Sequence, residues 1–227
     1  PVDTFEIKGF FRRSYDRLKR AIRFGQHMEY RFQKEEKENS VVFHVTHPNE
    51  GNLTFSLTQE LYTRVKTRFV LADDKFDEYL LALWVRYEAL GINANQYVVD
   101  ITYKESLRPF GFDFECFASP FNVYFSKYCS MFWDIERHFG SQGSFMSLEP
   151  RRGLYMANPP YDANLMDKMY QKVKQGLASQ EPVGFIMSLP KWENFELEAT
   201  VVKENLFVTS IEKKELFHNP FDAMKMV

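Results

Sequence analysis

The sequence has 227 residues, of which 44% are apolar and 17% aromatic, and its net charge is −2. A chain of this size and composition can bury a core without disulfides, which excludes an intrinsically disordered protein. The near-neutral charge gives no overall signature of nucleic-acid binding, and no apolar run of about 18 residues predicts a membrane span. Cys116 and Cys129 lie in aromatic-rich segments and are expected to be buried free thiols of a reducing compartment.

Three helical patterns occur within residues 1–95. In residues 10–37 apolar side chains recur at helical spacing, and residues 73–91 have the clearest helical period of the chain. Residues 56–70 predict another helix, with a Ser or Thr at its N-terminal cap. One short strand is expected at residues 41–47, between loop signals. Together these patterns predict a helical domain.

Residues 96–227 alternate short apolar runs with helical patterns. Helices are expected at 122–132 and 164–178, and strands at 110–121 (a strand entering a loop), 143–148, 153–158, 181–190 and 206–216. Strands that alternate with helices form a parallel sheet covered on both faces. The sequence therefore predicts an α/β domain after the helical one.

Basic residues are concentrated near the N-terminus. Between Lys8 and Arg23 seven residues are basic and one, Asp16, is acidic. Such a run can bind the phosphates of RNA. A solvated helix face is the alternative interpretation. The candidate RNA contacts are Arg12, Arg13, Arg17 and Arg20.

An Asn-Pro-Pro-Tyr motif at residues 158–161 directly follows an expected strand. Ligands of open α/β sheets bind at this edge of the sheet. Proline has no N–H to donate, so the motif presents acceptors: the amide oxygen of Asn158 and the carbonyl of Pro159, beside the ring of Tyr161. That arrangement suits a planar –NH2 group, which would donate one hydrogen to each acceptor while its aromatic system stacks on the ring.

The same arrangement suits methyl transfer to nitrogen. An amine conjugated to an aromatic ring is a poor nucleophile, and two acceptors can localise its lone pair and aim it at an electrophilic methyl group. The motif resembles that of methyltransferases that use S-adenosylmethionine on adenine, guanine or glutamine nitrogens. The alternative is a plain turn before a helix capped by Asp162 or Asn164.

Four longer stretches make the resemblance specific. "FECFASPFNVYFSKYCSMFWD", "FGSQGSF", "ANPPYDANLMDKM" and "FIMSLPKW" occur in this order, and they resemble the catalytic core of the phosphorylated CTD-interacting factor family, the cap-specific adenosine-N6 methyltransferases. The resemblance is dense from Phe110 to Trp192 and weaker in the helical part. It implies a helical domain docked on a Rossmann-like class I methyltransferase sheet. It also implies S-adenosylmethionine as donor and, as acceptor, the adenosine beside a 7-methylguanosine cap.

The resemblance also assigns residues. Asn158, Pro159, Pro160 and Tyr161 match the family's catalytic motif, and "FASPFN" occupies the place of a glycine-rich loop. The candidate donor contacts are therefore Phe117, Ala118, Ser119, Pro120 and Asn122. Without the family, this stretch would be interpreted as a strand end with a helix cap.

Three further positions lie near the expected sheet edge. Asp134 is a candidate for the ribose hydroxyls of the donor, or else a solvated acid near a helix end. Lys191 and Trp192 follow the next strand and are candidate substrate contacts. Trp192 either stacks on a base or the cap, or packs in the core.

The chain also departs from the family. No WW module is recognisable, so polymerase-tail binding is not supported, and the methyltransferase domain is expected to be C-terminally incomplete or reduced. The histidines are scattered, and no metal is expected. A nuclear location is expected from the family, with the cytoplasm as the alternative. The alternative functions are methylation of another planar nitrogen, in internal RNA or DNA, and a non-catalytic scaffold in an RNA–protein assembly.

Overall fold

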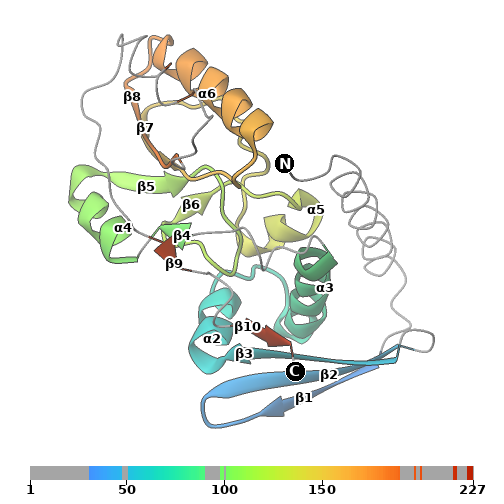
Figure 1. The fold of residues 1–227 in the computed structure, drawn as a ribbon. Coiled ribbons are helices and arrows are strands. Elements are labelled where there is room, and N and C mark those ends of the chain that lie inside the picture. The colour runs from blue at the N-terminus through green and yellow to red at the C-terminus, as the bar shows by residue number, and fades with distance from the viewer. Residues whose placement is uncertain are drawn as a thin grey trace, which may run out of the picture. The chain divides into compact units, whose positions relative to one another are not determined.

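The computed structural model describes residues 31–47, 51–89, 98–99, 101–189, 197, 200, 217–218 and 224–226. The chain folds into two compact units (Figure 1), one made of residues 1–94 and 221–227 and the other of residues 95–220. In the described ranges no helix is long and apolar enough to cross a membrane.

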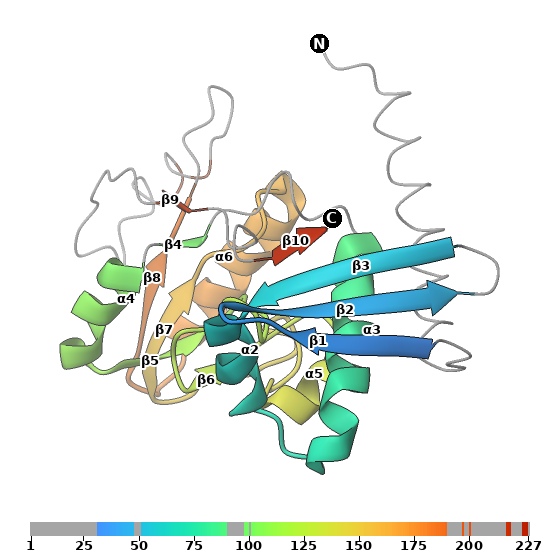
Figure 2. The same ribbon diagram turned by 90° about the horizontal axis from the view of Figure 1, so that it is seen from below.

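The first unit contains an antiparallel sheet. Its strands are β1 (Arg31–Glu36), β2 (Ser40–His47), β3 (Gly51–Thr58) and β10 (Met224–Met226), in the order β1-β2-β3-β10. Figure 2 shows β1, β2 and β3 side by side, as consecutive antiparallel strands. The last strand comes from the other end of the chain, and Met224 pairs with Leu57. The C-terminal residues therefore belong with this unit, although the sequence placed them in the α/β domain.

The helices of the first unit are α2 (Gln59–Lys66), the single-turn η1 (Asp73–Lys75) and α3 (Phe76–Ala89). Thr58 caps α2, as expected, by accepting a hydrogen bond from the Leu61 N–H. The inward side chains of β2 and β3 are buried, and the ring of Phe55 stacks on Trp84 of α3 with centroids 4.4 Å apart. Buried aromatic side chains are therefore a substantial part of the core of this unit, together with aliphatic ones.

The described residues of the first unit form a sheet with helices, so the helical domain that the sequence predicted is not shown. Residues 31–36 form a strand rather than the end of a helix, because they pair with β2 from Arg31 opposite Thr46 to Glu36 opposite Val41. The helix expected from residue 56 begins at Gln59, because the preceding residues continue β3. In both places, pairing with a partner strand overrides a local helical pattern. Residues 10–30 of the segment 10–37 lie outside the described residues.

The second unit is built on a parallel sheet. Its strands are β5 (Phe112–Glu115), β6 (Lys127–Tyr128), β7 (Gly153–Ala157) and β8 (Val183–Met187), in the order β6-β5-β7-β8. The helices are α4 (Ile101–Leu107), α5 (Trp133–Glu136) and α6 (Ala163–Leu177), with single turns η3 (Arg108–Phe110) and η4 (Arg137–Phe139). A separate antiparallel pair joins β4 (Val98–Val99) to β9 (Phe217–His218). The predicted α/β class is confirmed.

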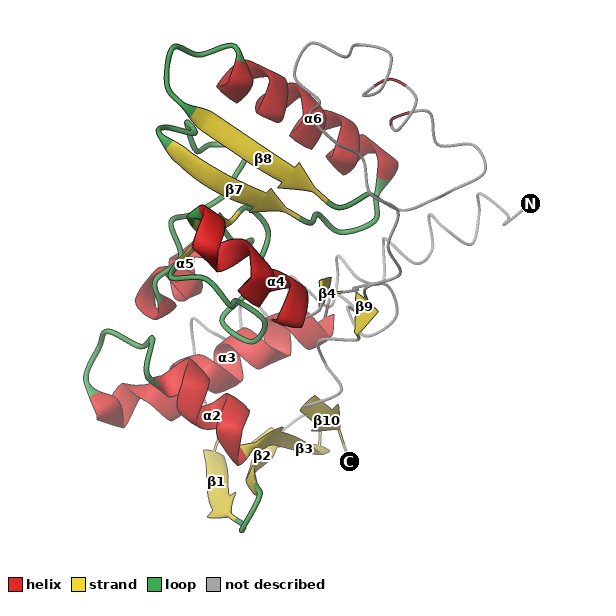
Figure 3. Cartoon of the chain, turned by 90° about the vertical axis from the view of Figure 1, so that its left-hand side faces the viewer, coloured by secondary structure: helices red, strands yellow, loops and turns green. Residues whose placement is uncertain are grey.

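Helices cover both faces of the parallel sheet. On one face Met169 and Val173 of α6 pack with Tyr155 and Ala157 of β7. On the other face Leu107 of α4 packs with Met156 and Phe125. Figure 3 shows α6 and α4 on opposite sides of β7 and β8. Successive side chains of β7 point to opposite faces of the sheet, and both faces are packed under helices, as the continuous apolar run predicted.

The local predictions for this unit had mixed outcomes. The strands at 153–158 and 181–190 and the helix at 164–178 are confirmed by β7, β8 and α6. The helix at 122–132 is wrong, because this segment is irregular apart from β6, and residues 143–148 form a turn rather than a strand. The strand expected at 206–216 lies outside the described residues.

Candidate active site at the carboxyl edge of the parallel sheet

The ends of β5, β7 and β8 lie together at one edge of the sheet. The Cys116 N–H donates to the carbonyl of Met156 at 2.8 Å, and the Ser188 N–H donates to that of Ala157 at 2.9 Å. The chain runs from β5 to β6 on one side of β5 and then returns to β7 on the other side. Such a switch of direction opens a crevice at the strand ends, where open α/β sheets bind ligands. The residues that follow β5 and β7 lie at this switch point.

The Asn-Pro-Pro-Tyr motif leaves β7 at the switch point. Ala157 is fully buried, while Asn158 and Tyr161 are half-buried. The Asn158 Oδ1 atom and the Tyr161 hydroxyl oxygen are themselves shielded from solvent. Tyr161 packs against a small cluster that contains Met166 and Tyr170 of α6. The motif is therefore held against α6 with its amide oxygen in a dry environment, where a hydrogen bond is electrostatically stronger than in water.

The motif is also a helix start. The Asp162 N–H donates to the Pro160 carbonyl at 2.8 Å, and the Asp162 carboxylate accepts from the Leu165 N–H at 2.8 Å. Asp162 therefore caps α6, as the turn interpretation expected. These bonds involve neither the Asn158 side chain nor the Pro159 carbonyl. The turn interpretation and the acceptor interpretation are thus compatible.

The loop after β5 is fixed by its own polar groups. The Asn122 Oδ1 atom accepts from the Ser119 N–H at 2.7 Å and from the Ser119 hydroxyl at 3.2 Å. The Ser119 carbonyl accepts in turn from the N–H groups of Asn122 and Val123, at 3.1 and 3.0 Å. The Ala118 N–H donates to the Cys129 carbonyl. Two of the candidate donor contacts, Ser119 and Asn122, therefore bind each other.

The other candidates at this edge are apolar or acidic. Phe117 is half-buried and packs edge-on against Phe145 with centroids 5.5 Å apart, and Pro120 is buried. Asp134 is exposed on α5, which follows β6. The neighbouring Trp133 was missed in the sequence. Its side chain is half exposed, and the Arg137 guanidinium lies over the ring, 5.1 Å from the ring centroid. Gly143, with φ at +93°, leaves room for this ring, since a Cβ there would lie 3.2 Å from it.

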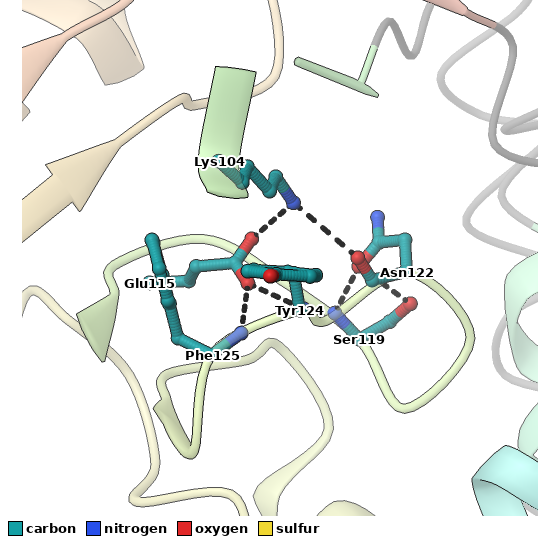
Figure 4. A network of polar contacts seen from close by, with 6 residues as sticks. All are labelled: Lys104, Glu115, Ser119, Asn122, Tyr124 and Phe125. Atoms are coloured by element: carbon teal, nitrogen blue, oxygen red, sulfur yellow. Dashed lines mark hydrogen bonds and ion pairs between the residues drawn. The ribbon is translucent and has the colours of Figure 1, made fainter. Parts of the chain in front are cut away.

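A buried ion pair, also missed in the sequence, lies beneath the loop (Figure 4). Lys104 of α4 and Glu115 of β5 are 2.5 Å apart, and their side chains are 4% and 6% exposed. Charged side chains are almost never fully buried unless they are paired. The signal in the sequence was an acid between Phe114 and Cys116, inside an otherwise apolar strand.

Both cysteines are free and buried, as predicted. Burial raises the pKa of the Cys129 thiol from its ordinary value of 9.0 to about 12. Burial, with the nearby Cys129 and Glu115, also raises the pKa of Cys116 well above its ordinary value. Neither thiol is therefore a nucleophile at neutral pH.

Several candidates fall outside the described residues: Lys191, Trp192, Arg12, Arg13, Arg17 and Arg20. Their roles stay predictions. Within the ranges that the structure describes, no group of three or more His, Cys, Asp and Glu side chains could hold a metal ion.

The residues at this edge fit a methyl donor in their chemistry. Phe117 and Ala118 are half-buried and follow β5, which pairs with the strand that leads to Tyr161, so they can offer apolar contacts to a ligand at this edge. Asp134 is an exposed acid on α5, which follows β6, and a carboxylate can accept hydrogen bonds from sugar hydroxyls. Loop and motif begin on adjacent strands, so one ligand can contact both.

A parallel α/β sheet with this switch point is compatible with a methyltransferase fold. The family described as phosphorylated CTD interacting factor 1 WW domain matches residues 57–218. The chain belongs to this family, which confirms the resemblance.

Two curated relatives carry the same name, mRNA (2'-O-methyladenosine-N(6)-)-methyltransferase. The human protein is 37% identical over 134 residues, which cover 53% of this chain and 19% of the relative. The mouse protein is 36% identical over 140 residues, which cover 55% of this chain and 19% of the relative. The chain therefore matches about a fifth of the length of these relatives.

Proposed function

We propose that this chain is the catalytic part of an enzyme that transfers a methyl group from S-adenosylmethionine to the exocyclic N6 amine of the adenosine beside an RNA cap. The observation that carries the proposal is the Asn158–Tyr161 motif, which begins beside the loop of residues 117–122 at the switch point of a parallel sheet. The order β6-β5-β7-β8 also suits a Rossmann-like class I methyltransferase sheet. The names of the human and mouse relatives support the same reaction.

Asn158 and Pro159 orient the substrate amine. The Asn158 Oδ1 atom accepts one amine hydrogen and the Pro159 carbonyl accepts the other, which localises the nitrogen lone pair. We assign the second acceptor to Pro159 and not to Pro160, whose carbonyl takes part in the turn by accepting from the Asp162 N–H. Bound S-adenosylmethionine supplies an electrophilic methyl group at this position. No general base is required, since the amine proton can leave after the methyl group has been transferred.

Tyr161 holds the plane of the base. Its ring stacks on the adenine, while its contacts with the cluster on α6 keep the ring in place. Base stacking on an aromatic ring contributes roughly 1–3 kcal/mol. Positioned acceptors and a fixed base plane lower the barrier by orientation and electrostatics.

The loop after β5 binds the donor in this proposal. Phe117, Ala118 and Pro120 provide apolar contacts, Ser119 and Asn122 shape the loop, and Asp134 binds the ribose hydroxyls. Asp134 is exposed, as a carboxylate that contacts the ribose of a bound donor must be.

Selection of one adenosine requires a second anchor, because every adenine offers the same amine. A methylated guanine is a cation that stacks well on aromatic side chains. Trp192 is our candidate for this contact, with Lys191 beside it, and the basic run from Lys8 to Arg23 is our candidate for the RNA phosphates. We place the reaction in the nucleus, where transcripts receive their caps.

Isothermal calorimetry with S-adenosylhomocysteine tests the proposal at its first step. The wild-type chain should bind, and Ala118→Leu should weaken binding because it adds bulk at the donor edge. Ala178→Leu is the matched control, since Ala178 is exposed at the far end of α6. Absence of binding by the wild-type chain would contradict the proposal and favour a non-catalytic scaffold.

A further inference from the structure

Lys104 and Glu115 form a buried ion pair that the proposed reaction does not use. Lys104 lies on α4, and Glu115 is the last residue of β5, directly before the loop of residues 116–125. The Lys104 Nζ atom donates to the Glu115 Oε2 atom at 2.5 Å. Both side chains are almost fully excluded from solvent. The pair therefore lies at the root of the loop to which we assign the donor.

The pair contacts the backbone on the far side of that loop. The Glu115 Oε1 atom accepts from the Tyr124 N–H at 2.6 Å and from the Phe125 N–H at 3.0 Å. The Lys104 Nζ atom also donates to the Asn122 carbonyl at 3.4 Å. Figure 4 shows these bonds converging on one carboxylate and one ammonium group.

The contacts continue to the near side of the loop through Asn122. Its Oδ1 atom accepts from the Ser119 N–H and hydroxyl. One chain of hydrogen bonds thus runs from α4 to Ser119, while the Cys116 N–H is bound to Met156 at the start of the loop. The segment that remains between these two fixed points contains Phe117 and Ala118.

Apolar packing also holds α4 on the sheet. Leu107 packs with Phe125 and Met156, and Tyr103 packs against the same cluster. A buried ion pair adds little to stability over apolar residues of similar size, because desolvation offsets the attraction. The charged groups instead fix the backbone of the loop, since the Glu115 carboxylate accepts from two neighbouring N–H groups and holds them in position.

We propose that Lys104 and Glu115 are positioning residues that hold the loop of residues 116–125 in the shape that binds the methyl donor. This inference rests on the proposed function. The pair acts through the loop and not on the substrate amine, because Asn158 and Tyr161 lie on the segment after β7. Loss of the pair should therefore weaken donor binding while the rate of the bound complex changes little.

The test compares two double variants in calorimetry with S-adenosylhomocysteine. Lys104→Met with Glu115→Gln removes both charges and keeps one oxygen for the two N–H groups. Lys127→Met with Asp113→Asn is the matched control, because it neutralises a 2.6 Å ion pair that also involves a β5 carboxylate but is about half exposed. The Lys104 and Glu115 double variant should raise the donor Kd by about tenfold or more, as loss of charged hydrogen bonds implies. The control should leave the Kd unchanged.

Two further readouts separate positioning from simple destabilisation. In the folded Lys104 and Glu115 double variant, amide hydrogen exchange should speed up at Ser119, Tyr124 and Phe125. Turnover with saturating donor should stay within about threefold of wild type, so that KM for the donor changes and kcat does not. If the double variant does not fold, Glu115→Asp keeps the charge but shortens the reach to the N–H groups, and the same changes are expected.

The outcomes distinguish the inference from the function on which it rests. A folded double variant that binds donor with the wild-type Kd would overturn the positioning role, as would unchanged exchange in the loop. Absence of donor binding by the wild type and by the control variant would instead contradict the proposed function. In that case amide exchange would still decide whether the pair fixes the loop.

Discussion

The N–H of Cys116 donates a 2.8 Å hydrogen bond to the carbonyl of Met156. This bond joins β5 to β7 at the last step before both strands leave the sheet. As a result, the loop that begins at Phe117 and the motif that begins at Asn158 start from neighbouring points. A donor held by the first and an amine held by the second can meet there without any movement of the sheet.

Asn158→Ala should lower methyl transfer by about 10²–10³-fold, because loss of one positioned hydrogen-bond partner of the transition state has this effect. Donor affinity and melting temperature should stay near the wild-type values. Single-turnover kinetics with radiolabelled donor measures the rate. Asn164→Ala, which removes an exposed amide from the first turn of α6, is the matched control and should be silent. Equal rates for the two variants would refute the acceptor role.

Tyr161→Ala should reduce transfer by the loss of base stacking, roughly 1–3 kcal/mol in the free energy of activation. Tyr161→Phe keeps the ring and should retain most activity. Because Tyr161 also packs on the α6 cluster, thermal unfolding of each variant should be recorded alongside the kinetics. A fully active, folded Tyr161→Ala variant would show that the ring does not hold the base.

The buried thiols should resist labelling while the chain is folded. With a pKa of about 12, the thiolate fraction of Cys129 at pH 8 is on the order of 10³-fold below that of an ordinary cysteine. Labelling with a chromogenic thiol reagent at pH 8 should therefore be slow in buffer and fast in guanidinium. Rapid native labelling of either cysteine would contradict their burial.

The same pKa shift has a consequence for stability. A folded-state pKa above the unfolded value means that the folded chain binds more protons between the two values, so the free energy of unfolding falls as pH rises from 9 toward 12. Denaturant titrations across this range should show the fall. A variant with Cys116→Ala and Cys129→Ala should lose less stability over the same range.

The sequence predicted those parts of the molecule that depend on local pattern. Helix α6 has a regular apolar period and an Asp cap, and β7 is a continuous apolar run, so both were placed correctly. The motif at Asn158 was found because its residue types carry the chemistry themselves. Its position at the sheet edge followed from the general behaviour of parallel strands.

The segments that were predicted wrongly owe their structure to partners distant in the sequence. Residues 31–36 contain good helix formers, but they form a strand because β2 pairs with them. The segment 122–132 has a helical pattern, yet Lys127 and Tyr128 form a strand because they pair with Phe114 and Glu115 of β5. A sequence pattern cannot show that Lys104, eleven residues away, is the partner of the Glu115 carboxylate.

Neutralising the basic run should weaken RNA binding and leave donor binding unchanged. Replacement of four residues by Gln, at Arg12, Arg13, Arg17 and Arg20, should reduce the slope of log K against log salt by up to about 3, as loss of four phosphate contacts on a single strand implies. Fluorescence anisotropy with labelled capped RNA at several salt concentrations measures this slope.

The control for that experiment removes the same charge elsewhere. Four exposed basic residues outside the run are suitable for replacement by Gln: Lys37, Lys75, Arg152 and Lys168. These changes should affect the slope much less. Equal slopes for the two variants would show that the run has no specific role in RNA binding.

The most direct test of the proposed function compares two RNAs that begin with the same 2'-O-methyladenosine, one with a 7-methylguanosine cap and one without. The chain is incubated with each RNA and S-adenosylmethionine, and the first nucleoside is analysed by mass spectrometry. We expect N6-methylation of the capped RNA, little of the uncapped RNA, and almost none of either with Asn158→Ala. Equal methylation of both RNAs, or methylation that survives the loss of Asn158, would contradict the proposal.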